Sequence, residues 1–324
     1  MFNNKTICVV VPAYNEEMLI SKTLTTMPSF VDAIIVVNDG SSDRTQEIIA
    51  SLQKTDSRII LINHNPNQGL GQSLITGYLR AREEGFDVVA VMAGDAQMSP
   101  DDLPAVVEPI TLGKCDYVKG NRLLRDDVVG RMPMYRYIGN SFLTFLTKFS
   151  TGYWHVIDPQ CGYTAISKNA LARIPIQDMI KGYGYNAHIL NMLNLNNFKV
   201  ADVEVEPVYG DEKSKIKLRN YIPVVSKLLI RLFFKRLLHK YVVREFHPLI
   251  LFYFLSFFNM FVLSIPLSIR FFYLYFQLGV APSTTLIILN FSVSMAFFSL
   301  FFAMWLDMED NKRLAYIVGG QSNE

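Results

Sequence analysis

The sequence has few cysteines and little excess charge of either sign. Its three cysteines among 324 residues show no CxxC spacing, which argues against a disulfide framework or a structural zinc site and favours a reducing compartment. The formal net charge is only +2, so the chain lacks the strong basicity typical of a general nucleic-acid binder. The first residues, MFNNKTICVVVPAYNEE, hold only a short apolar run, and we expect no signal peptide there.

The common phosphate-binding patterns are also missing. The stretch NQGLGQSLITGYLRA carries Gly69 and Gly71 but fits neither GxGxxG nor a P-loop, which weakens dinucleotide-binding and ATPase interpretations. The same stretch opens a predicted helix, whose first N–H groups can bind an anion. No metal-ligand spacing is found at His64, His155, His239 and His247.

Long apolar runs are present near the C-terminus. PLILFYFLSFFNMFVLSIPLSI and TTLIILNFSVSMAFFSLFFAMWL are each close to the roughly 20 residues that span a bilayer. Arg270 follows the first run, and placing it in mid-membrane costs about 2.5–3.5 kcal/mol, so we expect the first span to end before it. The aromatic residues that follow suit a membrane interface. The alternative is a pair of buried helices in a soluble protein.

A basic segment precedes the first span. Residues 213–244 hold ten lysines and arginines and no acidic residue, with apolar residues between them. This pattern predicts one or two amphipathic helices on a membrane surface. Because positive residues stay inside, the N-terminal part should be cytoplasmic, and two spans return the short tail to the same side. We therefore expect a multi-pass protein of the plasma or inner membrane.

The N-terminal part alternates between two kinds of segment. Short β-branched runs (ICVVVP, AIIVVND, IILINH, VVAVMAGD) are separated by helical patterns such as SDRTQEIIASLQK. This alternation predicts an open α/β sheet with flanking helices, in which ligands bind beyond the carboxyl ends of the strands. The expected division is 1–212 for this catalytic domain, 213–247 for the amphipathic helices, and 248–324 for two transmembrane helices and a cytoplasmic tail.

Polar residues follow the first two predicted strands. Tyr14, Asn15 and Glu16 follow one strand, where a ring can stack on a base beside amide and carboxylate groups. Asp39 follows the next and can accept hydrogen bonds from a ribose or a uracil-like ring, while Gly40 allows close backbone approach. Each alone is also ordinary cap and turn chemistry. Their occurrence at successive strand ends favours a nucleotide site.

A single carboxylate ends a later strand, in VMAGDAQMSP. Asp95 at the end of a buried strand is costly unless it binds something. Gln97 can add a neutral oxygen ligand. Since Mg²⁺ takes one or two carboxylates and completes its shell with phosphate and water, one aspartate suffices if the substrate brings a diphosphate.

The ordered motifs resemble a known family. VVVPAYNEE, VVNDGSSDRT, NQGLGQSLITGYLRA, GDAQMSP, KGNR and DPQCGYTA look like those of family 2 glycosyltransferases of the GT-A fold, over roughly the first two thirds of the chain. Within these, the polyprenyl-phosphate sugar transferases, which use dolichol or undecaprenyl phosphate, are most similar. The resemblance implies a GT-A sheet, a UDP- or GDP-hexose donor, Mg²⁺ or Mn²⁺, and a polyprenyl phosphate acceptor.

The resemblance also implies roles for the residues that match the family's motifs. The nucleotide would be held by Pro12, Tyr14, Asn15, Glu16, Asp39, Gly69 and Asp95. The family's metal motif reads Asp-x-Asp-x-Gln; here Asp95 and Gln97 match, but Ala93 replaces the first aspartate. That departure weakens the site or changes its geometry.

Further matches fall on the acceptor side. The acceptor phosphate would be bound by Lys119, Arg122, Arg136, Asn140, Ser214 and Lys215, although Tyr209 stands where a leading arginine is usual. Asp158, in DPQCGY, is either a general base or an organiser of its loop. Many family members carry an acid near Asn186 or His188, where this chain has none, and a lone His188 is more often a packed residue.

Three hypotheses follow. In the first, Asp95, Asp158 and Arg122 serve an inverting transfer of a hexose to a polyprenyl phosphate at the cytoplasmic membrane face. In the second, the acceptor is a hydroxyl of a lipid-linked glycan in polysaccharide or glycoprotein assembly. In the third, the chain is an inactive scaffold, which the missing aspartate and arginine motivate. Two spans can also pack against copies of themselves, so a homo-oligomer is one expected form.

Overall fold

The structure is a computed structural model that describes residues 1–123, 134–206 and 218–318, with the helix alone for 134–140 and 218–221. The chain forms two compact units. The first comprises Met1–Phe233 together with the chain from Leu314 onward, and the second comprises Phe234–Arg313.

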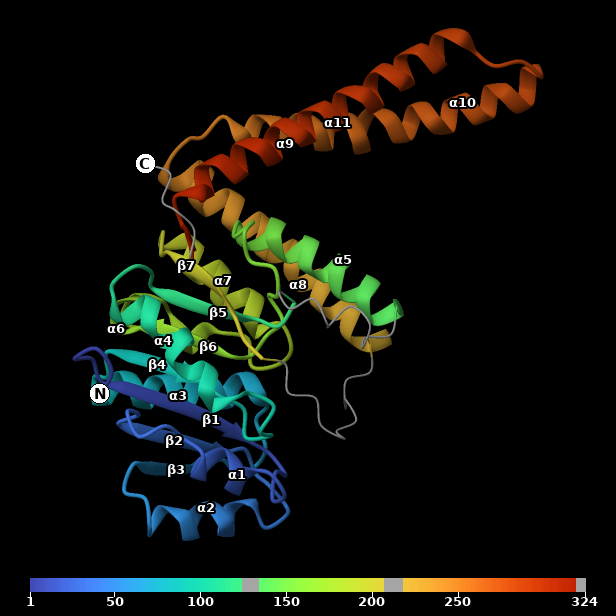
Figure 1. The fold of residues 1–324 in the computed structure, drawn as a ribbon. Helices are drawn as coiled ribbons and strands as arrows, with labels where there is room; N and C mark the ends of the chain where they lie inside the picture. The colour runs from blue at the N-terminus through green and yellow to red at the C-terminus, as the bar shows by residue number, and fades with distance from the viewer. Residues whose placement is uncertain (124–133, 207–217, 319–324) are drawn as a thin grey trace. The chain divides into compact units, whose positions relative to one another are not determined.

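An eight-stranded sheet in the order β3-β2-β1-β4-β6-β5-β7-β8 forms the centre of the first unit (Figure 1). All paired strands are parallel except β6, which runs antiparallel to β4 and β5. The strands are β1 (Ile7–Ala13), β2 (Ala33–Asn38), β3 (Ile59–Asn63), β4 (Val88–Val91), β5 (Tyr117–Asn121), β6 (Thr164–Ser167), β7 (Val200–Glu204) and β8 (Ala315–Ile317).

The central strands are apolar throughout because both faces of the sheet are covered. Along β1, Ile7, Val9 and Val11 enter one core, and Cys8 and Val10 enter the other. The first core is closed by α1 (Ile20–Thr25), α2 (Thr45–Gln53) and α4 (Leu103–Thr111); the second by α3 (Leu70–Glu84), α6 (Lys168–Arg173) and α7 (Tyr185–Leu195). The predicted open α/β sheet with flanking helices is confirmed.

Two longer helices pack together in the first unit. Helix α5 (Met134–Thr151) and the first part of α8 (Leu218–Leu238) lie side by side (Figure 1). Leu143 of α5 shares a buried cluster with Val225 and Leu229 of α8, and Phe149 meets Phe233 edge to face. This pairing joins the predicted amphipathic segment to the sheet-bearing unit.

Strand β8 comes from the C-terminal tail. Ala315, Tyr316 and Ile317 pair in parallel with Val200, Ala201 and Asp202 of β7. A strand of three residues gives no periodic signal, so the sequence predicted only a tail here. Both ends of the second unit therefore connect to the first unit.

The second unit contains two helices long and apolar enough to span a membrane. One helical run covers Leu249–Leu278 through α9 (Leu249–Phe257), a π-helical segment (Phe258–Ser264) and α10 (Ile265–Leu278); the other is α11 (Ser283–Lys312). Their mean hydropathies are 2.0 and 2.1. The helix does not stop before Arg270 but continues to Gly279, whose φ of 69° ends it, because no helix breaker lies between them.

Helix α8 and the π-helical segment after it (His239–Arg244) distribute their basic residues unevenly. Lys227, Arg231 and Lys235 are exposed. Arg236 is fully buried in the second unit against Asp307, with two contacts of 2.7 Å, and Lys240 is buried there too. The expectation that this whole segment presents its charges to a membrane surface is wrong for these two residues, because they have internal acidic or amide partners.

Candidate functional site

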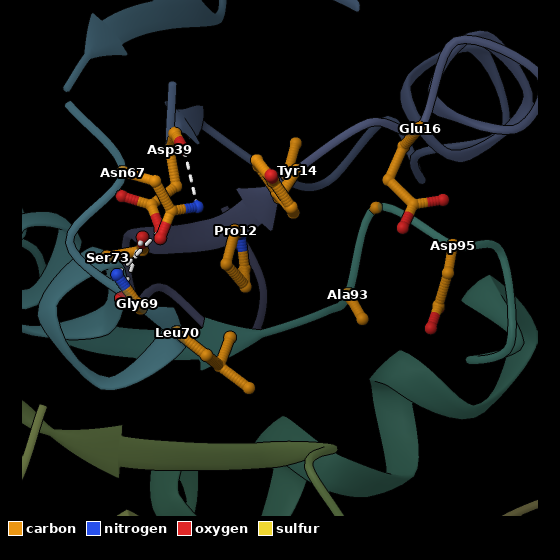
Figure 2. A pocket seen from close by; sticks show the side chains of 12 residues that line it. Pro12, Tyr14, Glu16, Asp39, Asn67, Gly69, Leu70, Ser73, Ala93 and Asp95 are labelled. Atoms are coloured by element: carbon orange, nitrogen blue, oxygen red, sulfur yellow. Dashed lines mark hydrogen bonds between the residues drawn. The ribbon is translucent and has the colours of Figure 1, made fainter. Parts of the chain in front are cut away.

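A pocket of about 370 Å³ lies at the carboxyl ends of β1, β2 and β4. Figure 2 shows Asp39 and Asn67 on one side, Glu16 and Asp95 on the other, and Pro12 and Tyr14 between them. Parallel strands present the residues that follow them at one edge of the sheet, so segments distant in sequence meet here. The lining comprises Pro12, Ala13, Tyr14, Glu16, Asp39, Asn67, Gly69, Leu70, Ser73, Ala93, Gly94 and Asp95.

The segment after β1 is held by the segment after β2. Asn15 adopts a φ of 56°, its N–H donates to Ser41 Oγ at 3.0 Å, and its Oδ1 accepts from Ser42 N at 2.9 Å. Asn15 thus joins two loops and lies outside the pocket, whereas Tyr14 lines it with an exposed ring. This arrangement fixes the backbone that carries Tyr14 and Glu16.

Asp39 is buried and holds the loop before α3. Its Oδ1 accepts from Gln68 N at 2.9 Å, and its Oδ2 accepts from Gly69 N at 2.8 Å. Asn67 Nδ2 donates to the carbonyl oxygen of Asp39 at 2.8 Å. Asp39 therefore shapes the pocket wall as well as lining it. At Gly40, φ is 68° and an added Cβ would lie 2.8 Å from Asn67 N, so glycine is required.

The segment after β4 carries Asp95. Its Oδ1 accepts from Gln97 N at 3.1 Å, and burial raises the pKa of Asp95. Ala96 between them has a φ of 54°, a left-handed conformation that is unfavourable for alanine and is found where a site requires it. Gln97 itself is exposed and lies outside the pocket. Ala93, where a carboxylate was expected from the motif, contributes only its methyl group.

The pocket offers oxygen ligands that suit a divalent cation. Asp95 and Glu16 supply carboxylate oxygens on the same side of the pocket (Figure 2). Mg²⁺ and Mn²⁺ prefer such ligands, with phosphate and water completing the shell. Within residues 1–123, 134–206 and 218–318, no group of three or more His, Cys, Asp or Glu could hold a metal alone. The donor set fits a cation that arrives with a diphosphate.

A second polar cluster lies around the end of β5. Lys119 is fully buried, and its Nζ donates to Cys161 O and to Asn186 Oδ1, the latter at 2.6 Å. Burial lowers the pKa of Lys119 to about 8. Asn186 Nδ2 in turn donates to Gln160 O at 3.3 Å. Lys119 thus ties β5 to α7 and to the DPQC segment from inside the fold.

Arg122 and Asp158 form a two-point ion pair beside this cluster. Arg122 Nε lies 2.8 Å from Asp158 Oδ2, and an η nitrogen lies 3.2 Å from Oδ1. The Asp158 side chain is 5% exposed, whereas that of Arg122 is 41% exposed. The buried Asp158 carboxylate thus holds the partly exposed guanidinium of Arg122 at two points.

Asp202 of β7 lies behind the same loop. Its Oδ2 accepts from Asn121 Nδ2 at 2.6 Å and from Ile157 N at 3.1 Å. Its Oδ1 is buried without a hydrogen-bond partner, and burial raises the pKa of Asp202 to about 6. Sequence reasoning missed this residue because its burial depends on tertiary packing.

The pocket and the polar cluster around the end of β5 are connected through neighbouring loops. Tyr163 OH donates to Ser99 O at 3.0 Å, and a Cβ added at Gly162 would lie 3.0 Å from Met98 Cε. The segment with Asp158 thus lies against the segment with Asp95. Sequence reasoning missed Asn67, Leu70 and Ser73 of the pocket, although the glycine-bearing loop that carries them was identified.

The remaining predicted acceptor residues stay predictions. Arg136 and Asn140 lie on α5 at positions where only the helix is described, and Ser214 and Lys215 lie outside the described residues. His188 is buried, and its Nδ1 accepts from Ile180 N at 3.1 Å, which fits the packed role expected for a lone histidine.

Residues 8–174 match the profile described as glycosyl transferase family 2. A UDP-N-acetylglucosamine--dolichyl-phosphate N-acetylglucosaminyltransferase from Methanococcus voltae is 32% identical over 221 residues, covering 64% of this chain and 88% of that protein. A polyprenol monophosphomannose synthase from Mycolicibacterium smegmatis is 24% identical, covering 61% and 75%.

Solved structures share the fold. Glucosyl-3-phosphoglycerate synthase from Mycobacterium tuberculosis, in complex with Mn²⁺, UDP and glucosyl-3-phosphoglycerate, superposes with a TM-score of 0.54 at 20% identity, over 72% of this chain and 80% of that one. At this identity the likeness establishes a common fold, with an open sheet of the same type.

Proposed function

The chain belongs to glycosyltransferase family 2, and we propose that it moves a hexose from a nucleotide sugar to a polyprenyl phosphate at the cytoplasmic face of a membrane. The observation that carries the proposal is the pocket that brings Tyr14, Asp39 and Asp95 together at the carboxyl ends of three strands. The relatives named for dolichyl phosphate and polyprenol substrates support a lipid phosphate as the acceptor.

The donor fits the pocket along its length. Figure 2 shows Asp39 and Asp95 on opposite sides of the pocket. In this proposal the base and ribose occupy the Asp39 side, where the exposed ring of Tyr14 can stack, and the diphosphate occupies the Asp95 side. Asp95, with Glu16 on the same side of the pocket and Gln97 two residues further on, would hold a Mg²⁺ or Mn²⁺ ion, which would supply positive charge against the leaving diphosphate. The family resemblance implies a UDP- or GDP-hexose as the donor, and uracil and guanine each offer a ring N–H that a carboxylate can accept.

The described residues of the second cluster support a phosphate as the acceptor. A hydroxyl acceptor requires a general base, whereas a phosphate is already ionised. Among the described residues of the second cluster, Asp158 is paired with Arg122, and position 186 holds a neutral amide bound to Lys119. We therefore assign Asp158 the role of orienting Arg122. Arg122, with Arg136 and Lys215, binds the acceptor phosphate and offsets its repulsion from the donor diphosphate.

The transfer is then a single displacement. An oxygen of the acceptor phosphate bonds to the anomeric carbon while the bond from that carbon to the diphosphate oxygen breaks. The electron pair leaves with the nucleoside diphosphate, no proton moves, and the anomeric configuration inverts. The protein's part is to align the two phosphate groups and exclude water.

The membrane assignment rests on the second unit and on α8. Two helices are apolar enough to span a bilayer, and basic residues on α8 precede them. The exposed face of α8 mixes apolar Val224, Ile230 and Phe234 with basic Lys227 and Arg231, as expected of a helix lying in the interface.

The proposal is tested by turnover in membranes that contain the full chain. Membranes are supplied with polyprenyl phosphate and radiolabelled UDP- or GDP-hexose, and lipid-extractable label is counted for the wild type and for Asp95→Asn. We expect labelled lipid with the wild type and loss of nearly all turnover with the variant, because an amide is a much weaker ligand than a carboxylate for the cation that would offset the charge of the diphosphate. Wild-type turnover in the variant contradicts the role of Asp95.

A further inference from the structure

His64 is a buried residue for which neither the motifs nor the proposed reaction has a use. It follows β3, and its backbone N–H donates to Asn38 O at 2.9 Å. Its Nδ1 lies 2.8 Å from Asp39 Oδ1, and its Nε2 lies 2.9 Å from Thr76 Oγ1 on α3. Both ring nitrogens are therefore engaged, one with the pocket carboxylate and one with the helix behind it.

The network fixes the proton on one nitrogen. An ionised carboxylate can only accept, so Nδ1 carries the hydrogen that is donated to Asp39. Nε2 then accepts from the Thr76 hydroxyl, which can rotate to donate. The tautomer is assigned from this arrangement of partners.

The carboxylate of Asp39 is nearly saturated by these contacts. It has about four acceptor positions, of which His64, Gln68 N and Gly69 N occupy three. One position remains on a residue that lines the pocket. His64 and Gln68 N both bind Oδ1, and Gly69 N binds Oδ2, so the open position lies on Oδ2. His64 is the side-chain donor that supports the two backbone N–H groups in holding this orientation.

We infer that His64 is a positioning residue for the nucleotide. By binding Oδ1, it holds the Asp39 carboxylate so that Oδ2 accepts from Gly69 N in the loop before α3 and also from an N–H or O–H of the bound nucleoside. This inference rests on the proposed function, since it requires a nucleotide in the pocket. His64 touches no reacting atom. Its loss therefore weakens donor binding and leaves the rate at saturating donor nearly unchanged.

Two substitutions at position 64 distinguish the contribution of Nδ1 from that of Nε2. In His64→Asn the amide nitrogen is attached to Cγ, as Nδ1 is, so it can still donate to Asp39. In His64→Gln the amide nitrogen is one atom further out, as Nε2 is, so it can reach Thr76 but leaves Asp39 without its donor. Thr76→Val removes only the hydrogen bond between Thr76 Oγ1 and His64 Nε2 and serves as the matched control.

The experiment measures the dissociation constants of UDP and GDP with Mn²⁺ by isothermal titration on the full chain in detergent. For whichever nucleotide the wild type binds, we expect affinities close to wild type for His64→Asn and Thr76→Val. For His64→Gln we expect affinity about tenfold weaker, the effect of one lost hydrogen bond to a charged group. In turnover assays the same variant should show a raised donor KM with kcat nearly unchanged.

Two results overturn the inference. Equal affinity in all variants shows that His64 does not act on the nucleotide. Equal loss in His64→Asn and His64→Gln, with equal loss of melting temperature, shows that the imidazole acts only as core packing. Failure of the proposed function is distinguishable from both, because the wild-type protein would then bind neither nucleotide.

Discussion

Because position 93 is alanine, the segment after β4 contributes one carboxylate to the pocket lining, that of Asp95. The carboxylate of Glu16 lies on the same side of the pocket (Figure 2). A metal held by so few protein oxygens depends on the substrate's phosphates for the rest of its shell. We therefore expect weak affinity for Mn²⁺ alone and much higher affinity when UDP is present.

Ala93→Asp tests this dependence directly. A second carboxylate beside Asp95 should tighten Mn²⁺ binding about tenfold, the scale on which single groups at metal sites act. The affinity is read from the free-Mn²⁺ signal in electron paramagnetic resonance, with and without UDP. Ala93→Asn, of nearly equal size and without charge, is the matched control; equal affinities for the two variants would falsify the metal assignment.

The pH dependence of stability should report Asp202. Its folded pKa of about 6 lies above the ordinary value of 3.8, so the folded state holds a proton that the unfolded state releases. Stability should therefore fall as the pH rises from roughly 4 to roughly 6, and stay level above that. Asp202→Asn removes this contribution to the pH dependence of stability.

The measurement is the melting temperature of wild type and Asp202→Asn at about pH 4.5 and about pH 7. The wild type should gain stability relative to the variant at the lower pH. A constant difference between the two proteins across this range contradicts a raised pKa for Asp202.

At the residue scale, the sequence predicted the polar residues at the strand ends well. Tyr14, Asp39 and Asp95 are identifiable because a strand that stops at a polar residue presents it at the sheet edge. The hydrogen bonds that occupy Asp39 were not predictable, since their donors are backbone N–H groups of a loop and a histidine without motif spacing. Asp202 was missed for the same kind of reason.

At the scale of elements, the end of α8 is held to α11 by a buried ion pair. Arg236 and Asp307 are both fully buried, and Tyr241 OH donates to the same carboxylate at 2.8 Å. Asn311, one turn after Asp307, accepts from Lys240 Nζ at 2.7 Å. Removing one member of such a pair leaves an uncompensated buried charge.

Arg236→Met should therefore destabilise the protein by about 3–5 kcal/mol, whereas Arg236→Met with Asp307→Met should recover most of the loss. Thermal unfolding in detergent, followed by tryptophan fluorescence from Trp154 and from Trp305 on α11, measures both. Lys235→Met is the control, since Lys235 is exposed on the same helix. A double variant no better than the single one contradicts the role given to the pair.

Sequence periodicity predicted that α8 is an amphipathic helix, but it did not predict which of its basic residues are buried. The interleaved apolar and basic residues of α8 identified an amphipathic helix before its partners were known. The pattern could not separate Lys235 from Arg236, because only the folded chain shows which one meets an aspartate some 70 positions later. For the same reason β8 was not predicted: three residues become a strand only when β7 offers its edge.

At the scale of the whole molecule, the chain leaves the first unit, forms two apolar helices, and returns to pair β8 with β7. If both helices span a membrane, the loop between them faces the side opposite to the sheet. This connectivity is compatible with either orientation, and only the basic residues before the first span predict that the sheet lies on the cytoplasmic side.

Cysteine labelling tests the orientation. The native cysteines Cys8, Cys115 and Cys161 are buried, so background labelling is low. In intact cells, a membrane-impermeant maleimide should label Ala281→Cys, in the loop between the helices, and should label Ser51→Cys, exposed on α2, only after lysis. The reverse pattern would place the catalytic unit outside.

The central claim is that this chain joins a hexose to a polyprenyl phosphate. The most direct measurement is a screen of UDP- and GDP-hexoses with polyprenyl phosphate and the purified full chain, with the lipid products read by mass spectrometry before and after mild acid. The account predicts one new lipid, heavier than the acceptor by one sugar residue, that reverts to polyprenyl phosphate in mild acid. An acid-stable glycoside, or no lipid product with any donor that the protein binds, would contradict it.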